Sequence, residues 1–437
     1  MYLLIEPATK LLGTTTLPGS KSQAVRALVI ALLARGTSYI TNLPKNEDVA
    51  TAIKVISQLS AEVTVIDSET VKIKSTGTPH FIDSAQLKTG DSGITTRFIL
   101  PILGLREKKA PPIVVDTGAQ MRQRPIAPLV NALRQLGMKI DYLEEEGRFP
   151  LHISGKLEGG PIFLEGLTSQ YLSALLIALP RTTESSSITV TQLRERPYIT
   201  MTLEWLQRSG INYQQKHLKE ADKDIFQLQG NQTWTPHDTK LQGDFSSAAP
   251  LLAAAALLPG KVTLKGLDFN DPQADKRLVT LLQEMGAIIK VDPAAHSITI
   301  EGGTPLKGTT IDASNTPDLL PILAVLGTQA QGITKIVNVP QARIKETDRI
   351  HAITTNLSQM GAQLKEYRDG ITLYQSQLKG CLHLQSYGDH RTVMALTVAA
   401  LIATGKTKIM GAEALDKTFP QFTSTLKSLG APLSLDP

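Results

Sequence analysis

The chain has 437 residues, of which 41% are hydrophobic and 19% charged, a composition typical of a globular protein with two domains of roughly 200 residues each. Its 45 Lys and Arg residues outnumber the 40 Asp and Glu residues, and this mild excess favours anionic partners. The basic residues are scattered and only 5% of residues are aromatic, which argues against a nucleic-acid binder. No apolar run reaches the ~18 residues that a membrane span requires. The single cysteine argues against an intramolecular disulfide and against a Cys-rich metal site.

An apolar helix that follows a small or polar turn is predicted six times along the chain. The turns contain, in order, Ser20, Asp91, Ser169, Ser246, Asp318 and Asp389, which are 71 to 78 residues apart. The helices are expected within 19–36, 90–103, 166–180, 243–260, 315–327 and 388–405. Self-similarity at a fixed period indicates a repeat architecture, here of six units of about 72 residues.

The remainder of each repeat is predicted to contain a strand and a second, amphipathic helix. Strand-like stretches occur at 37–43, 186–193, 261–267, 333–339 and 407–412. The second helices are expected to begin in 129–143, 278–291, 353–367 and 422–435 and to lead into another strand. Gly137, Gly286 and Gly361 are predicted to end three of these helices, because glycine adopts the left-handed conformation that stops a helix.

The beginnings of the apolar helices are candidate anion sites. They open with Ser, Thr, Asp or Gly, and helix N-termini carry free backbone N–H groups and partial positive charge. Several such ends, if they converge, would bind phosphate or carboxylate. Basic residues recur there and in the turns between repeats, namely Lys21, Arg26, Arg122, Arg124, Arg343, Lys345, Arg349, His390, Arg391 and Lys417. If 342–349 is helical, Lys345 and Arg349 share one face.

The chain contains no HExxH, CxxC, GxSxG or Walker A pattern, so neither a metal nor a covalent serine mechanism has support in the sequence. We therefore expect no metal and no cofactor. Cys381 lies in the alternating stretch 379–384, where a buried thiol is expected.

Nine segments together resemble the 5-enolpyruvylshikimate-3-phosphate (EPSP) synthase family over essentially the full chain. In family order and spacing they are LPGSKSQAVRAL, GDSGITTR, MRQRPI, SQYLSALL, RPYI, TPDLLP, RIKETDR, YGDHR and KTFP. The resemblance implies an α/β fold of two inside-out α/β barrels, each of three βαβαββ-type repeats, with the active site in the interdomain cleft. The implied domains are 1–19 with 242–437, and 20–241.

The resemblance also implies a 3-phosphoshikimate 1-carboxyvinyltransferase. Such an enzyme transfers the enolpyruvyl group of phosphoenolpyruvate to the 5-hydroxyl of shikimate 3-phosphate and releases phosphate, in chorismate and aromatic amino-acid biosynthesis. Asp318 would accept the hydroxyl proton, Glu346 would protonate the methylene carbon, and Lys21 would contact both substrates. Two carboxyl groups in different environments suit this chemistry, and a dense Lys/Arg shell suits two acidic substrates.

By matching motif, the resemblance assigns the binding residues in two groups. Phosphoenolpyruvate would contact Lys21, Gly93, Arg124, Gln170, Arg349, Arg391 and Lys417. The acceptor would contact Lys21, Ser22, Arg26, Thr168, Ser169, Gln170, Tyr198, Asp318, Gln341 and Lys345.

Four positions depart from the family pattern: Asp91 and Ile94 in GDSGIT, Glu195 before RPYI, and Gln341 before RIKETDR. Glu195 would repel a phosphate dianion unless it turns outward, so a diverged enolpyruvyl transferase for a cyclic acceptor without the 3-phosphate is the alternative. Ile94 stands where the family has Thr beside the phosphoenolpyruvate pocket. We therefore expect weaker inhibition by glyphosate, which resembles phosphoenolpyruvate.

Two further alternatives have less support. A UDP-sugar enolpyruvyl transferase would pair Lys with Asn near the N-terminus, whereas the pair here is Lys21 and Ser22. A non-catalytic anion-binding scaffold would not need both Asp318 and Glu346. We expect small-molecule substrates only, with no nucleic acid, no membrane and no secretion signal, and a cytoplasmic monomer.

Overall fold

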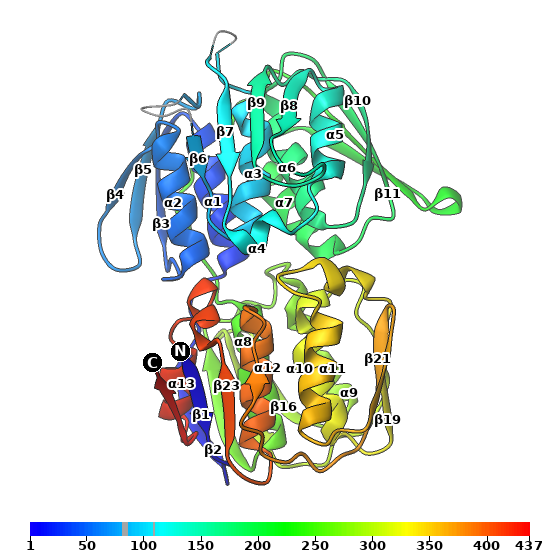
Figure 1. Cartoon of the computed structure of the whole chain (residues 1–437). Helices are drawn as coiled ribbons and strands as arrows, with labels where there is room; N and C mark the ends of the chain where they lie inside the picture. Colours follow the sequence, from blue (N-terminus) through cyan, green and yellow to red (C-terminus); the bar gives the residue numbers. More distant parts are fainter. Residues whose placement is uncertain (81–85, 108–109) are drawn as a thin grey trace. The chain divides into compact units, whose positions relative to one another are not determined.

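The computed structural model describes residues 1–80, 86–107 and 110–437. The chain divides into two compact units, Met1–Ser20 with Gln242–Pro437 (unit 1) and Lys21–Leu241 (unit 2) (Figure 1). Ser20 remains with unit 1 because its N–H donates to the carbonyl of Gln242 at 2.8 Å. The expected boundary after residue 19 differs by one residue from this division.

Within the described residues, each unit holds three four-stranded sheets of one topology. In every sheet one outer strand pairs in parallel with its neighbour, and the other two pairs are antiparallel. The strand orders are β16-β17-β15-β2, β18-β19-β21-β20 and β22-β23-β1-β24 in unit 1, and β14-β3-β5-β4, β6-β7-β9-β8 and β10-β11-β13-β12 in unit 2.

The elements of unit 1 come from both ends of the chain. Its strands are β1 (Tyr2–Ile5), β2 (Leu11–Thr16), β15 (Gly260–Lys265), β16 (Ile288–Asp292), β17 (Ser297–Gly302), β18 (Thr310–Asp312), β19 (Ile333–Val337), β20 (Leu364–Tyr367), β21 (Gly370–Tyr374), β22 (Leu384–Gln385), β23 (Thr407–Met410) and β24 (Leu433–Asp436). Its α-helices are α8 (Phe245–Leu257), α9 (Arg277–Glu284), α10 (Leu320–Gln329), α11 (Arg349–Gln359), α12 (His390–Leu401) and α13 (Phe422–Ser428). Its 3₁₀ helices are η3 (Ala274–Lys276), η4 (Pro317–Leu319), η5 (Pro340–Ile344) and η6 (Ala412–Lys417).

The elements of unit 2 are continuous in sequence. Its strands are β3 (Gly36–Thr41), β4 (Glu62–Val65), β5 (Val71–Ser75), β6 (Gln86–Lys88), β7 (Ile113–Asp116), β8 (Met138–Tyr142), β9 (Leu151–Gly155), β10 (Pro161–Glu165), β11 (Ser186–Thr191), β12 (Tyr213–Leu218), β13 (Lys223–Leu228) and β14 (Thr239–Lys240). Its helices are α1 (Lys21–Leu33), α2 (Glu47–Gln58), α3 (Gly93–Leu103), α4 (Ala119–Arg122), α5 (Ala127–Gln135), α6 (Ser169–Ala178), α7 (Arg196–Arg208), η1 (Leu179–Arg181) and η2 (Lys219–Ala221).

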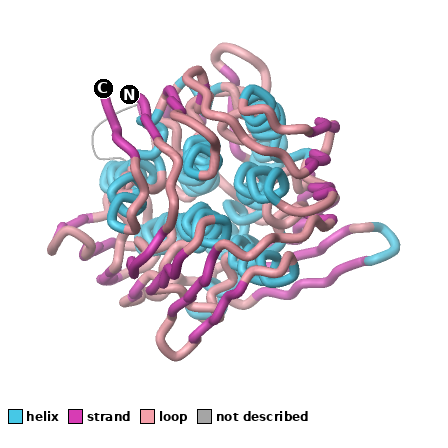
Figure 2. The backbone as a smooth tube through the Cα atoms, turned by 90° about the horizontal axis from the view of Figure 1, so that it is seen from below, coloured by secondary structure: helices cyan, strands magenta, loops and turns pink. Residues whose placement is uncertain are grey.

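The apolar helix of each repeat forms the core of its unit. Helices α8, α10 and α12 in unit 1, and α1, α3 and α6 in unit 2, are buried along nearly their whole length. A helix that is apolar on all sides is stable only when other elements surround it. The sheets supply this cover from outside, so the helices lie inside and the strands outside (Figures 1 and 2). This confirms the predicted inside-out α/β architecture.

The second helices pack one face on the core and end as predicted. After α5, α9 and α11, the glycines Gly137, Gly286 and Gly361 have φ of 86°, 103° and 88°. This left-handed conformation is strained for other residues, so the glycines turn the chain from helix to strand. None of the described helices is long and apolar enough to cross a bilayer.

Candidate active site

The candidate site residues of unit 1 gather around Arg349, the first residue of α11. Its guanidinium is 1% exposed and donates to three carboxylates: Asp389 Oδ2 at 2.7 Å, Asp318 Oδ1 at 2.6 Å and Glu346 Oε2 at 2.7 Å. Burial opposes the charge, but the three carboxylates raise the pKa of Arg349 well above its ordinary value. Arg349 therefore holds both carboxyl groups that are predicted to transfer protons.

Asp318, in η4, has cations close to both of its carboxylate oxygens. Lys345 Nζ lies 4.0 Å from Oδ1, and Arg391 Nη2 lies 3.6 Å from Oδ2. Burial raises the pKa of Asp318, but Arg349, Lys345 and Arg391 outweigh burial and hold it far below the usual range. Asp318 is thus an anion in this state.

Arg391 connects the beginnings of several helices. It follows Asp389, the N-cap of α12, whose Oδ1 accepts from the N–H of Arg391 at 2.6 Å. Its Nη1 donates to the Ser246 carbonyl in the first turn of α8 at 2.9 Å. The beginnings of α8, η4, α11 and α12 are thus joined by hydrogen bonds and ion pairs within unit 1. At the end of η6, Lys417 Nζ donates to the Gly388 carbonyl at 3.3 Å, just before α12.

Two basic residues of α1 are held in place in unit 2. Lys21 Nζ pairs with Asp48 Oδ2, in the first turn of α2, at 2.9 Å. Arg26 is 1% exposed, and its guanidinium donates to the carbonyls of Ser22 and Tyr198 at 2.9 and 3.1 Å. Arg26 thereby ties the beginning of α1 to the first turn of α7.

Gly93, the first residue of α3, lies against two guanidinium groups. A Cβ at Gly93 would come 2.5 Å from Nη1 of Arg124 and 2.9 Å from Nη1 of Arg97. Any larger residue would therefore push Arg124 away from this helix beginning. Arg97 Nη1 also donates to Gln170 Oε1 at 2.7 Å, which links α3 to α6.

Glu195 points inward, onto the beginning of α6. It is 2% exposed, and its Oε2 accepts from the Ser169 N–H at 3.0 Å, the Ser169 hydroxyl at 2.7 Å and the Thr168 hydroxyl at 3.2 Å. The expectation that Glu195 could turn outward is wrong. A helix N-terminus with two hydroxyls stabilises a carboxylate, and here the protein supplies that carboxylate itself.

The other three departures also have local explanations. Asp91 Oδ1 accepts from the Met121 N–H at 2.9 Å, so it caps the short helix α4. Gln341 is 4% exposed; its Nε2 donates to the Ser314 carbonyl at 2.8 Å, and its Oε1 has no hydrogen-bond partner among the described residues. Ile94 is buried in the first turn of α3, directly after Gly93.

Two details of the sequence interpretation are corrected. Lys345 and Arg349 do not share a helix face, because η5 ends at Ile344 and α11 begins at Arg349. The irregular link instead lets both side chains approach Asp318. Cys381 is only partly buried, and its Sγ lies 3.9 Å from Gln359 Oε1.

The sequence interpretation missed four charged residues of these clusters. Asp275 belongs to the cluster of unit 1, because its Oδ2 accepts from the hydroxyl of Ser246, whose carbonyl accepts from Arg391. Asp48 and Asp275 lie outside the motifs that match the family, so no local signal identified them. Arg97 and Asp389 do lie within GDSGITTR and YGDHR, and their place in those motifs was the available signal. The described residues include no group of three or more His, Cys, Asp or Glu side chains placed to hold a metal ion.

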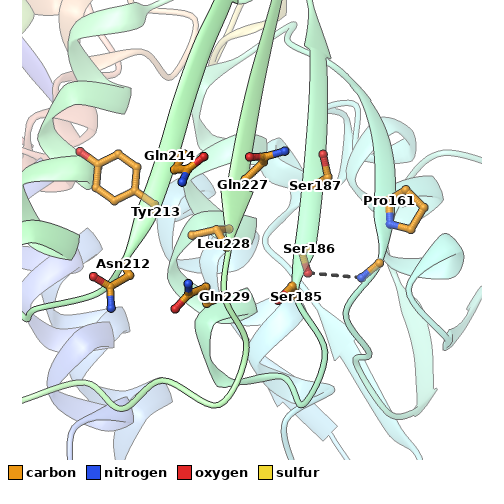
Figure 3. Close-up of a pocket in the computed structure, with 11 residues that line it drawn as sticks. Pro161, Ser185, Ser186, Ser187, Asn212, Tyr213, Gln214, Gln227, Leu228 and Gln229 are labelled. Carbon is orange, nitrogen blue, oxygen red and sulfur yellow. Dashed lines mark hydrogen bonds between the residues drawn. The ribbon is translucent and has the colours of Figure 1, made fainter.

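A pocket of about 730 Å³ lies elsewhere, at one end of the sheet β10-β11-β13-β12 (Figure 3). Ser187, Gln214 and Gln227 are among its lining residues, and none of the lining side chains is charged. A neutral lining does not suit two acidic substrates, and none of the predicted site residues lies there. The charged residues around Arg349 in unit 1 and around Lys21, Arg26 and Arg124 in unit 2 are therefore better candidates for the active site than this pocket.

Comparisons with known proteins agree with these observations. Residues 5–426 match the model of the family EPSP synthase (3-phosphoshikimate 1-carboxyvinyltransferase). A 3-phosphoshikimate 1-carboxyvinyltransferase of Acetivibrio thermocellus is 40% identical over 98% of both chains, and one of Methanocaldococcus jannaschii is 37% identical over 99% of both.

Two solved structures share the fold. EPSP synthase from Acinetobacter baumannii aligns with a TM-score of 0.83 and 24% identity over 100% of both chains. The enolpyruvyl transferase NikO from Streptomyces tendae aligns with a TM-score of 0.78 and 18% identity, over 99% of this chain and 98% of that one.

Proposed function

The chain belongs to the EPSP synthase family and is a carboxyvinyltransferase, and from this premise we propose roles for its own residues. The substrates of the family are phosphoenolpyruvate and shikimate 3-phosphate. The observation that carries the proposal is Arg349, which holds Asp318 and Glu346 on one guanidinium, with Arg391 and Lys345 close to Asp318. This cluster combines two carboxyl groups with the cations that an acidic substrate requires.

Phosphoenolpyruvate is bound in unit 1 by Arg349, Arg391 and Lys417. Its carboxylate and phosphate take over hydrogen bonds that these side chains make within the free protein. Charge-assisted hydrogen bonds to planar guanidinium groups orient such ligands well. In unit 2, Lys21, Arg124 and Gln170 supply further contacts, and the missing side chain of Gly93 leaves the Arg124 guanidinium in place.

Ligand binding at Arg349 and Arg391 prepares Asp318 as a base. Without substrate, the surrounding cations hold the pKa of Asp318 far below its usual range. A substrate anion that shares these cations weakens their hold on Asp318 and raises its proton affinity. The base thus becomes effective only when phosphoenolpyruvate is present.

The reaction then proceeds by addition and elimination. Asp318 accepts the proton of the acceptor 5-hydroxyl, the oxygen bonds to C2 of phosphoenolpyruvate, and Glu346 in its protonated form donates a proton to C3. In the second step C3 returns a proton to the Glu346 carboxylate, the C2–O bond to phosphate breaks, and the departing phosphate takes the proton held by Asp318. The products are the carboxyvinyl ether and inorganic phosphate. Lys345, next to Glu346, stabilises the charge that develops on the acceptor side.

The acceptor is bound mainly by unit 2, where Thr168 and Ser169 contact its phosphate. Ser22, Arg26, Thr168, Ser169 and Tyr198 come from the beginnings of α1, α6 and α7, and the Arg26 hydrogen bonds keep α1 and α7 in register. Asp318, Gln341 and Lys345 contribute from unit 1. We further propose that the enzyme acts in the cytoplasm as a monomer, which the single cysteine and the supply of every named group by one chain support.

Glu195 favours a second candidate function. Because its carboxylate already occupies the Thr168 and Ser169 donors, an acceptor without a 3-phosphate would fit without moving it. The enzyme would then transfer the carboxyvinyl group to a related, unphosphorylated cyclic acceptor.

One assay tests both candidates. Release of inorganic phosphate from phosphoenolpyruvate is measured with shikimate 3-phosphate and, separately, with shikimate. Turnover with shikimate 3-phosphate at least about a hundredfold above that with shikimate is expected, because a bound phosphate contributes several charge-assisted hydrogen bonds. Turnover with shikimate alone would establish the second candidate, and no turnover with either acceptor would refute both.

A further inference from the structure

Glu195 fills a place that the proposed function assigns to a substrate. One oxygen of its carboxylate accepts three hydrogen bonds from Thr168 and Ser169 at the beginning of α6. The carboxylate is 2% exposed, so water does not share these donors to any extent. In the free protein the anion site at α6 is therefore already occupied by an anion of the same chain.

Two anions cannot use this site together. Thr168 and Ser169 are the residues proposed to bind the phosphate of the acceptor. Both of their hydroxyls and the Ser169 N–H donate to Glu195 in this structure. A phosphate beside an ionised carboxylate would meet like-charge repulsion and would lack donors. When the phosphate binds, the Glu195 carboxylate has to leave.

The backbone around Glu195 is held so that only the side chain needs to move. Glu195 is the N-cap of α7 and has φ 56° and ψ 39°, and its carbonyl accepts from the Tyr198 N–H at 3.0 Å. The next residue, Arg196, forms a two-pronged pair with the buried Asp224 of β13, at 3.0 and 2.7 Å. Because Arg196 and the turn to Tyr198 are anchored, the carboxylate can leave α6 by rotation of its own side-chain bonds.

We infer that the Glu195 carboxylate is an internal competitor of the acceptor phosphate. The phosphate binds only by displacing this carboxylate from α6, so Glu195 sets the affinity and selectivity of the acceptor site. This inference rests on the proposed function. It assigns Glu195 a double role, as the cap of α6 in the free protein and as the group that weakens phosphate binding. Removing its charge should therefore lower the stability of the free protein and raise its affinity for the acceptor phosphate.

The experiment measures shikimate 3-phosphate and shikimate binding by titration calorimetry, with the full chain and no phosphoenolpyruvate. For Glu195→Gln the dissociation constant of shikimate 3-phosphate should fall about tenfold or more, because a charge-assisted competitor is lost, while that of shikimate stays within about twofold. The melting temperature without ligand should fall at the same time. If Glu195 had only a structural role, its replacement would lower the stability of the protein and its affinity for the acceptor together.

Two further variants complete the test. Glu195→Ala removes the competitor altogether. It should also lower the dissociation constant of shikimate 3-phosphate, and it should lower the melting temperature without ligand by more than Glu195→Gln does. Glu165→Gln, an exposed position at the end of β10, removes one negative charge from the same unit and should change neither quantity.

Weaker binding of shikimate 3-phosphate to both Glu195 variants, or an equal gain for both acceptors, would overturn the inference. The phosphate-release assay on the unmodified chain separates this outcome from failure of the proposed function. Turnover of shikimate 3-phosphate together with weakened binding in the variants would refute only the role of Glu195.

Discussion

Replacement of Asp275 by Asn should stabilise the protein in a strongly pH-dependent way. Asp275, in η3, is 1% exposed; its Oδ2 accepts from the Ser246 hydroxyl, and its Oδ1 has no hydrogen-bond partner among the described residues. Burial raises its pKa to about 6; Arg391 lowers it in part, and Asp318 and Asp244 raise it further. The folded protein therefore favours the neutral acid.

The size of the effect follows from the two pKa values. The pKa of an Asp with the ordinary value of 3.8 rises to about 6 on folding. At about 1.4 kcal/mol for each pH unit, ionisation of Asp275 costs the folded state on the order of 3 kcal/mol. Because the pKa is raised, this stability is fully present below pH 3.8 and is lost as the pH rises through about 6. Asn carries no charge at any pH and avoids the loss.

The assay is calorimetric unfolding of the parent and Asp275→Asn at several pH values from 4 to 8. The melting temperature of the variant should lie close to that of the parent near pH 4, exceed it increasingly between pH 4 and about pH 6, and keep a constant excess above that pH. Asp369→Asn, an exposed position between β20 and β21, is the matched control and should show no such trend. An Asp275→Asn gain that is equal at pH 4 and pH 8, or a loss at pH 8, would refute the reasoning.

Three further predictions concern single residues. Glu346→Gln should lower kcat for phosphate release by about a hundredfold or more, because the group that protonates C3 is lost; a change below about threefold would exclude that role. Asp224→Asn should lower the free energy of unfolding by about 2 kcal/mol in urea titration, because the buried carboxylate that holds Arg196 is lost; unchanged stability would show that the pair contributes nothing. Ile94→Thr should lower the glyphosate inhibition constant several-fold in the phosphate-release assay, because the smaller residue relieves crowding beside Gly93; an unchanged or higher constant would contradict the crowding argument.

Local pattern was sufficient to predict the architecture and the family. The six apolar helices, the amphipathic helices ending at Gly137, Gly286 and Gly361, and the motifs around Lys21 and Arg349 are all visible over short stretches of chain. Helical periodicity, caps and turn residues act over a few positions, so the sequence alone expresses them. The predicted α/β fold, the family and its activity are confirmed, whereas the roles of the individual site residues stay predictions.

Only the tertiary structure decided which charged groups meet. Glu195 reaches Ser169, 26 residues away, and Arg349 reaches Asp318 and Asp389, 31 and 40 residues away, on different elements. No local pattern specifies such pairs, because each depends on how separate helices and turns pack in three dimensions. The same holds for Asp275, whose raised pKa comes from burial and from neighbours on other elements. Sequence periodicity thus determines the repeats, and the packing of elements distant in sequence determines the electrostatics of the site.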